Sequence, residues 1–371
     1  MGNQQIGSDF PYASSIALGS SNFLFNNVIF TGATQDVLAN SAIKWETTET
    51  TNFGLDAGFL NQKLTLTAEY YIRKTKDILL PLPIPLVMGL SPSIQNAGDV
   101  ENKGLDFSLS WQDALGDFSY SARFNFSDVK NEVTNLSGVG PIISGNYITK
   151  VGSPIGSIYG YESVGIFQNQ AAIDAAPTQF GTLIPGNIQY KDQNKDGKIN
   201  ADDRVIIGDP FPKISYGLNL GAKYKGFDLS VYFQGVGKRD VVLQDDAAWA
   251  LWNAGKIQEW QVREFWSPEN TGAKFPIIAA TSAGSNDAQI SSTWVFDASY
   301  LRVRNISFGY TLPETLFKNN FVNSLRVYFS GQNLFTFDKL PQGIDPLIPN
   351  DSSGEAFPIT STFNIGVDVQ F

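Results

Sequence analysis

The sequence contains no cysteine and no histidine, and few of its residues are charged. Without those two residue types it has no Cys/His zinc site, thiol nucleophile, disulfide or imidazole base. Charged residues make up 17% of the chain, below the roughly 25% of ordinary soluble domains. The 36 Asp and Glu outnumber the 26 Lys and Arg, so the net charge is −10. An acidic chain repels phosphate backbones, and we therefore expect no nucleic acid partner.

Long hydrophobic segments are also missing. The longest apolar run, Ile78–Leu90, is too short to cross a bilayer as a helix and is interrupted by prolines. The first ten residues have neither a basic nor an apolar segment, so they do not form a signal peptide. Aromatic residues, by contrast, reach 13%, and the chain has 34 Gly and 18 Pro. This mixture is typical of an all-β protein.

Strict alternation of apolar and polar residues is the strongest pattern. Apolar side chains occupy every second position from Phe363 to Phe371, which places them on one face of a sheet. An early strand is expected around 6–18. In the strand that starts at Tyr300, the alternation changes phase near Asn305 and predicts a β-bulge. The same pattern predicts four hairpins, at 53–72, 105–126, 214–233 and 300–333.

The predicted connections alternate strictly between short and long. The short ones are 60–63, 113–117, 225–226 and 312–322, and the long ones are 19–48, 75–101, 131–211, 237–298 and 334–360. In an antiparallel meander, alternate connections lie at the same end of the sheet. Short turns on one rim and long loops on the other predict a transmembrane β-barrel with periplasmic turns and extracellular loops. A soluble β-sandwich also alternates, but strands of about ten residues suit a tilted bilayer crossing.

Several segments, in a fixed order over nearly the whole chain, carry a further signal. They include KWETTETTNFGLD, NAGDVENKGLDFSLSW, GSIYGYESVGIFQNQ, YKGFDLSVYFQGVG, SYLRVRNISFGYTLP and GQNLFTF. Together they resemble the C-terminal barrel half of SusC/RagA-type TonB-dependent transporters of Bacteroidetes outer membranes. The resemblance implies that residues 1–371 supply about ten of about 22 strands, with the plug and N-terminal strands absent. We then expect Met1 to be a start inside a longer reading frame, or the edge of a fragment.

The resemblance also implies a function. The parent protein would be an outer-membrane importer of oligosaccharides or peptides, not an enzyme. It would work with a SusD-like lipoprotein, and with the TonB complex through the missing N-terminal part. Phe371 resembles the C-terminal aromatic signal read by the outer-membrane insertion machinery. A different class stays open: a soluble calcium-binding β-protein that acts as a glycan-binding or adhesive module.

The sharpest local motif is DQNKDGKINADD, at 192–203 within the loop 131–211. Its spacing matches a calcium loop, with a glycine at the sixth position for the sharp turn. It ends in Asp, where an EF-hand has Glu. The motif predicts a Ca²⁺ site in this loop, and the alternative is an exposed turn that binds nothing. The expected ligands are Asp192, Asn194, Asp196, Asp203 and the backbone carbonyl of Lys198.

Aromatic residues in the two largest loops are candidates for contact with a ligand or partner. Such side chains stack on sugar rings or pack on a protein surface. The alternative is that they only fold the loops onto themselves, because the tryptophans form no single helical stripe. No acidic pair is brought together by the sequence, so a glycosidase is not expected. The candidates are Trp249, Trp252, Trp260 and Trp266 in 237–298, with Tyr159 and Tyr161 in 131–211.

Overall fold

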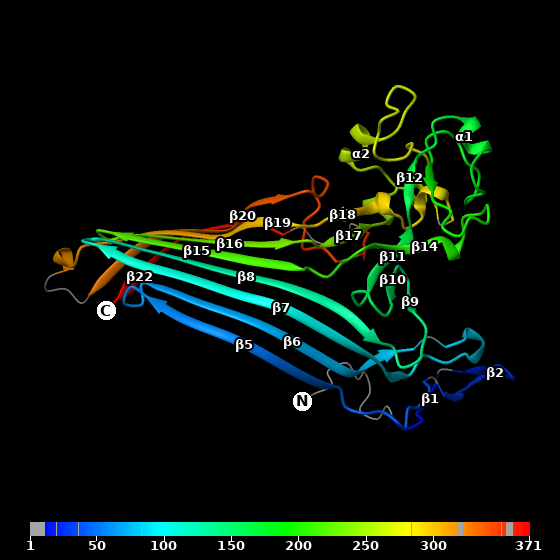
Figure 1. Cartoon of the computed structure of the whole chain (residues 1–371), viewed down its shortest axis with the longest axis horizontal. Coiled ribbons are helices and arrows are strands. Elements are labelled where there is room, and N and C mark those ends of the chain that lie inside the picture. The colour runs from blue at the N-terminus through cyan, green and yellow to red at the C-terminus, as the bar shows by residue number, and fades with distance from the viewer. Residues whose placement is uncertain are drawn as a thin grey trace.

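The computed structural model describes residues 12–371, apart from 20, 36, 83, 283, 318–321, 350 and 354–358. It is dominated by one long antiparallel sheet in which the neighbours are consecutive long strands (Figure 1). The prediction of an all-β barrel wall is therefore confirmed. In spatial order the strands are β5 (Thr47–Phe59), β6 (Leu64–Pro81), β7 (Ile94–Leu115), β8 (Phe118–Asn135), β15 (Ile214–Tyr224), β16 (Phe227–Gly237), β19 (Tyr300–Thr311), β20 (Ser324–Asp338) and β22 (Thr362–Gln370).

The sheet is open and single, with β5 and β22 at its edges in the described part of the chain. It contains nine strands, where the sequence and its family resemblance led us to expect about ten. The early strand is the reason, because Ile16–Leu18 (β1) pairs with Ala33–Gln35 (β4) outside the sheet. Residues 6–11 of that prediction lie outside the described residues. The smaller sheets of the described residues gather at the loop end of the long sheet and do not cover one of its faces (Figure 1), so the described part of the chain is not a β-sandwich.

The connections follow the predicted order, with short turns at one end and long loops at the other (Figure 1). The turn between β15 and β16 shows why a two-residue link suffices. Lys225 and Gly226 have φ of 46° and 87°, as a turn that matches the right-handed twist of a hairpin requires. The predicted bulge is also confirmed, since the β19–β20 register shifts between Val303 and Asn305.

The strands extend further toward the loop end than the sequence predicts. Residues of β7 stay paired with β8 up to Asp99↔Asn135, in polar segments where alternation is lost. The large loops therefore cover 136–213 and 238–299 instead of 131–211 and 237–298. The connection expected at 75–101 shrinks to 82–93.

The two large loops fold together into one body, here called the loop unit (136–213 and 238–299). Their backbones meet where the Tyr161 N–H donates to the Ile290 carbonyl, at 2.9 Å. Most of the chain's buried apolar residues lie here rather than in the sheet. Its elements are β9 (Ile142–Ser144), β10 (Tyr147–Thr149), β11 (Ser157–Tyr161), β12 (Ser163–Ile166), α1 (Gln170–Asp174), β13 (Ile188–Tyr190), β14 (Arg204–Gly208), β17 (Asp240–Leu243), α2 (Glu259–Glu264) and β18 (Val295–Asp297).

Short elements complete the structure. Phe23–Phe25 (β2) and Val28–Phe30 (β3) form a small hairpin beside β1 and β4, and Asp351–Ser352 (β21) joins β17 and β18 in a three-stranded sheet. The helices α1 and α2 have five and six residues. Within the described residues, no helix combines the length and the apolar character needed to span a membrane.

Candidate functional site

One face of the long sheet is apolar and exposed. Its side chains include Phe53 and Leu55 on β5, Phe227 on β16 and Phe363 and Ile365 on β22, all exposed. Water contact with so continuous an apolar surface is unfavourable, and soluble monomers rarely keep such patches. Lipid contact removes the penalty, as on the outer face of a membrane barrel.

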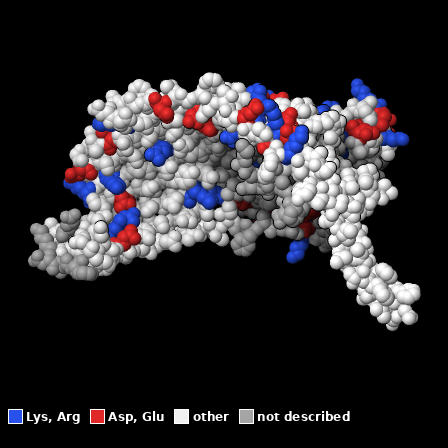
Figure 2. All heavy atoms as spheres, turned by 90° about the horizontal axis from the view of Figure 1, so that it is seen from below, with Lys and Arg blue, Asp and Glu red and all other residues white. Residues whose placement is uncertain are grey.

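The opposite face of the sheet is polar, and its side chains form hydrogen bonds with one another. The Thr67 hydroxyl donates to Asp56 at 2.7 Å and the Ser127 hydroxyl donates to Asp106 at 2.5 Å. A cavity of about 520 Å³ lies along this face, beside Glu69 and Asp106. The side of the molecule shown in Figure 2 is hollowed, and its charged residues are sparse in the middle and gather toward the ends. This face can line a water-filled passage.

An arginine and two aspartates form an ionic cluster that spans four neighbouring strands near the short-turn end of the polar face. The Arg326 guanidinium on β20 donates to both carboxylate oxygens of Asp228 on β16, at 2.8 and 2.7 Å, and to Asp368 on β22 at 3.1 Å. The intervening strand β19 carries Gly309 at the crossing, where a Cβ would lie 2.5 Å from the guanidinium. A larger residue at 309 would therefore displace the guanidinium, and glycine leaves it room to cross β19 in this position.

A buried carboxylate joins the two halves of the loop unit. Asp287 is 4% exposed. It accepts hydrogen bonds from the Asn187 amide at 2.6 Å and from the Ile188 N–H at 2.8 Å, while its own carbonyl accepts from the Trp294 indole at 3.0 Å. Burial raises the pKa of Asp287 to about 6. The hydrogen bonds from Ile188 and Asn187 lower the pKa, but their effect is smaller than that of burial. The folded loop unit thus holds this proton more tightly than the unfolded chain does.

This carboxylate predicts that the loop unit loses stability as the pH rises. Between about pH 4 and pH 6 the folded state binds more protons than the unfolded state, so the free energy of unfolding falls as the pH rises, by about 2 kcal/mol between pH 4.5 and pH 8, and stays low above pH 6. Denaturation at pH 4.5 and pH 8, followed by tryptophan fluorescence, measures the difference. Asp287→Asn is the control and should flatten the dependence. Equal pH profiles for the two proteins would contradict the assignment.

The residues of the predicted calcium loop are tied by their own hydrogen bonds. Asp192 accepts from the Lys195 N–H at 2.6 Å and from the Gly197 N–H at 2.8 Å, through different oxygens. The fully buried Asp203 likewise accepts from the N–H groups of Gln193 and Asn200, each at 2.9 Å. Among the described residues, no three acidic side chains converge into a group that could hold a metal. This arrangement does not by itself form a calcium cage, and the Ca²⁺ site stays a prediction.

Asp192→Ala separates the two interpretations of this loop. It removes the acceptor of several backbone N–H groups, so segment 188–210 should become protease-sensitive even in chelator, with a loss of about 1 kcal/mol as for other lost side-chain caps. Asp202→Ala is the matched control, since Asp202 is exposed and, among the described residues, no hydrogen bond reaches its carboxylate. Millimolar calcium that protects the wild-type segment relative to chelator would confirm the metal. Equal cleavage would leave only a hydrogen-bonded turn.

The aromatic candidates mostly build the core of the loop unit. Trp249 and Trp266 are each 6% exposed, and Trp252 packs edge-on against Trp249 at 4.7 Å between ring centroids. Tyr161 is buried in the same core. This packing matches the alternative that these side chains fold the loops. Tyr159 instead makes a cation–π contact with Arg204, whose guanidinium carbon lies 4.5 Å from the ring centroid. Trp260 is partly buried and lines a cavity.

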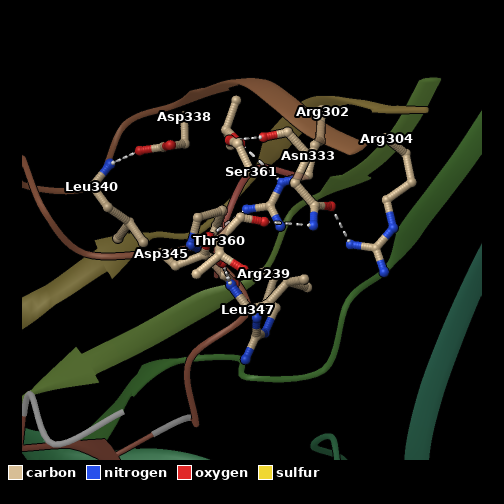
Figure 3. Close-up of polar contacts among 12 residues, drawn as sticks. Arg239, Arg302, Arg304, Asn333, Asp338, Leu340, Asp345, Leu347, Thr360 and Ser361 are labelled. Atoms are coloured by element: carbon tan, nitrogen blue, oxygen red, sulfur yellow. Dashed lines mark hydrogen bonds and ion pairs between the residues drawn. The ribbon is translucent and has the colours of Figure 1, made fainter. Parts of the chain in front are cut away.

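Two arginines that the sequence does not single out hold the last long loop. That loop, here called the strap (339–349 and 351–353), is drawn in Figure 3. Arg302 is 1% exposed and bonds to the Thr336 hydroxyl at 2.8 Å and to the Asp345 carboxylate. Arg239 donates to the carbonyls of Pro346 at 2.6 Å and Ile348 at 3.0 Å. Arg302 lies on the polar face of β19, so the strap folds over that face at the loop end.

A second polar group joins β19, β20 and the segment just before β22 (Figure 3). Arg304 donates to the side-chain oxygen of Asn333 at 2.8 Å, and the Asn333 amide donates to the Thr360 carbonyl at 3.2 Å. Arg302 and Arg304 occupy ordinary positions of β19, and Arg239 lies in the connection between β16 and β17. No spacing in the sequence distinguishes these arginines, because their partners lie far along the chain.

Comparisons with known proteins agree with this geometry. The family model described as "TonB dependent receptor-like, beta-barrel" matches residues 10–334. TonB-dependent receptor P3 of Formosa agariphila is 34% identical over 90% of this chain, and TonB-dependent receptor SusC of Bacteroides thetaiotaomicron is 29% identical over all of it. The chain spans 35% and 36% of these two relatives.

A solved structure shows the same fold. The structure of the RagAB peptide transporter superposes with a TM-score of 0.80 at 24% identity, over 97% of this chain and 38% of that one. The likeness extends through the long sheet and the loop unit, because nearly the whole chain is covered.

Proposed function

Because this chain belongs to the TonB-dependent receptor β-barrel family, we propose that it forms part of an outer-membrane importer of oligosaccharides or peptides. One observation carries the proposal: a sheet with an exposed apolar face, a polar face, short turns at one end and a folded loop unit at the other. The family is one of transporters and not of enzymes, in agreement with the sequence prediction. The alternative of a soluble calcium-binding module has lost its basis in a sandwich fold.

We propose the following orientation of the sheet and the loop unit in the outer membrane. The apolar face contacts outer-membrane lipid, the short turns face the periplasm and the loop unit faces the cell exterior. We further propose that a SusD-like lipoprotein sits on the loop unit and that the TonB complex supplies energy through other parts of the protein. The support for both partners is the relation to SusC and the shared fold with the RagAB transporter. Phe371, which follows β22 directly, is the proposed insertion signal.

Growth on defined nutrients tests the import function. A strain that lacks the protein should fail to grow on at least one oligosaccharide or peptide as sole carbon or nitrogen source. Growth on the constituent monosaccharides or amino acids should be unchanged, because small molecules cross the outer membrane through other channels. The gene supplied in trans should restore growth. Unimpaired growth on a broad panel of both substrate classes would contradict import.

A further inference from the structure

A cavity on the loop unit combines aromatic and charged side chains. It measures about 300 Å³ and lies between α2, residues 274–275, β18 and the start of the strap. Its walls include Trp260, Phe275 and Phe296, together with the charged side chains of Lys274 and Glu264. It is separate from the polar barrel face, the predicted calcium loop and the arginine contacts of the strap.

The floor of the cavity is aromatic. Phe275 and Phe296 are almost fully buried and stack on each other at 6.0 Å between centroids. Trp260 meets Phe275 edge-on at 5.0 Å. Within the described part of the chain, the buried indole N–H of Trp260 has no hydrogen-bond acceptor, and such orphaned donors call for an explanation, an unseen ligand being one. These rings give the cavity an apolar wall against which the apolar face of a sugar ring can pack.

One cation at this cavity lacks a carboxylate partner. The Lys274 ammonium lies 5.1 and 5.2 Å from the ring centroids of Phe275 and Phe296. No carboxylate of the described residues is within ion-pair distance of it. The neighbouring cations differ, because Lys339 pairs with Asp297 at 2.7 Å and Arg263 with Glu259 at 3.8 Å. On a chain of net charge −10, a cation held over aromatic rings is suited to attract an anionic ligand.

We propose that this cavity binds a negatively charged sugar residue, a pyranose that carries a carboxylate or a sulfate, within an acidic oligosaccharide. The sugar ring packs against the aromatic side chains, and its anionic group pairs with Lys274. At the wall, Glu264 accepts hydrogen bonds from ring hydroxyls and the Gln342 amide donates to them. A volume of about 300 Å³ suits one ring rather than a longer segment. The inference rests on the proposed import function and names its substrate class.

Calorimetry on the full chain purified in detergent tests the proposal. The probes are trigalacturonic acid, a sulfated galactose trisaccharide, neutral maltotriose and triglutamate. We expect at least one acidic trisaccharide to bind tenfold or more tightly than maltotriose, with affinity that falls as salt screens the charge. The two acidic probes distinguish carboxylate from sulfate. No binding of either, binding equal to maltotriose, or tighter binding of triglutamate would overturn the proposal.

Three variants locate the binding. Lys274→Gln should reduce the affinity for the acidic trisaccharide to the maltotriose level, while Lys274→Arg keeps most of it. Lys256→Gln is the matched control, since Lys256 is an exposed lysine of the same loop unit that does not line the cavity, and it should bind like wild type. Unchanged tryptophan fluorescence verifies folding. Wild-type affinity in Lys274→Gln would overturn the assignment, whereas failure of import itself would appear in the growth assay and not here.

Discussion

Replacing Arg302 with alanine should release the strap and lower the stability of the loop end by about 3–5 kcal/mol. That range is typical when one partner of a buried ion pair is removed. The guanidinium is 1% exposed and joins Thr336 of β20 to Asp345 of the strap. Without it, Asp345 loses its cation and the strap loses a contact that draws it over the polar face. Cleavage by added protease within 339–349 should rise sharply.

Two further variants separate this effect from a general loss of charge. Arg263→Ala removes an arginine whose side chain is 82% exposed, and surface pairs of this kind contribute little. Arg302→Lys keeps the charge but lacks the planar guanidinium that bonds two partners at once. Cleavage of its strap should therefore lie between that of Arg302→Ala and that of the wild type. Equal cleavage of the strap in wild type and Arg302→Ala would show that other contacts hold the strap.

The barrel wall could be predicted from the sequence because two different solvents act on it directly. Lipid on one face and water on the other impose a period of two on every strand. The alternation at 363–371 therefore indicates directly which side chains face lipid and which face water. The phase change near Asn305 could be detected in the sequence for the same reason, and the structure has a register shift there. Beyond the apolar band the constraint ends, which explains why the ends of β7 and β8 were predicted too short.

The loop unit and the strap could not be predicted in the same way. Their contacts join distant positions, such as Asn187 and Asp287, which are 100 residues apart. No periodicity records such a pairing, and the tryptophans of this region gave an ambiguous pattern because they pack in an irregular core. Arg302 on β19 and Arg239 in the connection after β16 were missed because their partners in the strap lie more than 40 residues further along the chain, and no local pattern indicates such a contact.

The calcium motif shows the limit of spacing alone. The oxygen-bearing residues from Asp192 to Asp203 occupy the expected positions. In the structure, two of their carboxylates accept hydrogen bonds from backbone N–H groups, and the Ca²⁺ site stays a prediction. The same residue types satisfy a tight turn and a metal loop, because both need short side chains with oxygen acceptors. Only the direction of the oxygens distinguishes the two, and sequence does not record it.

The central claim is that the loop unit and the short turns lie on opposite sides of the outer membrane. The natural chain has no cysteine, so single cysteines at Ala201, Ala254 or Asp117 provide unique labelling sites. Ala201 and Ala254 are exposed in the loop unit, and Asp117 is exposed in the short turn between β7 and β8. A membrane-impermeant maleimide applied to intact cells should label Ala201→Cys and Ala254→Cys fully and Asp117→Cys only after permeabilisation. Labelling of Asp117→Cys in intact cells, or of the loop-unit cysteines only after permeabilisation, would contradict this orientation and with it the proposed importer.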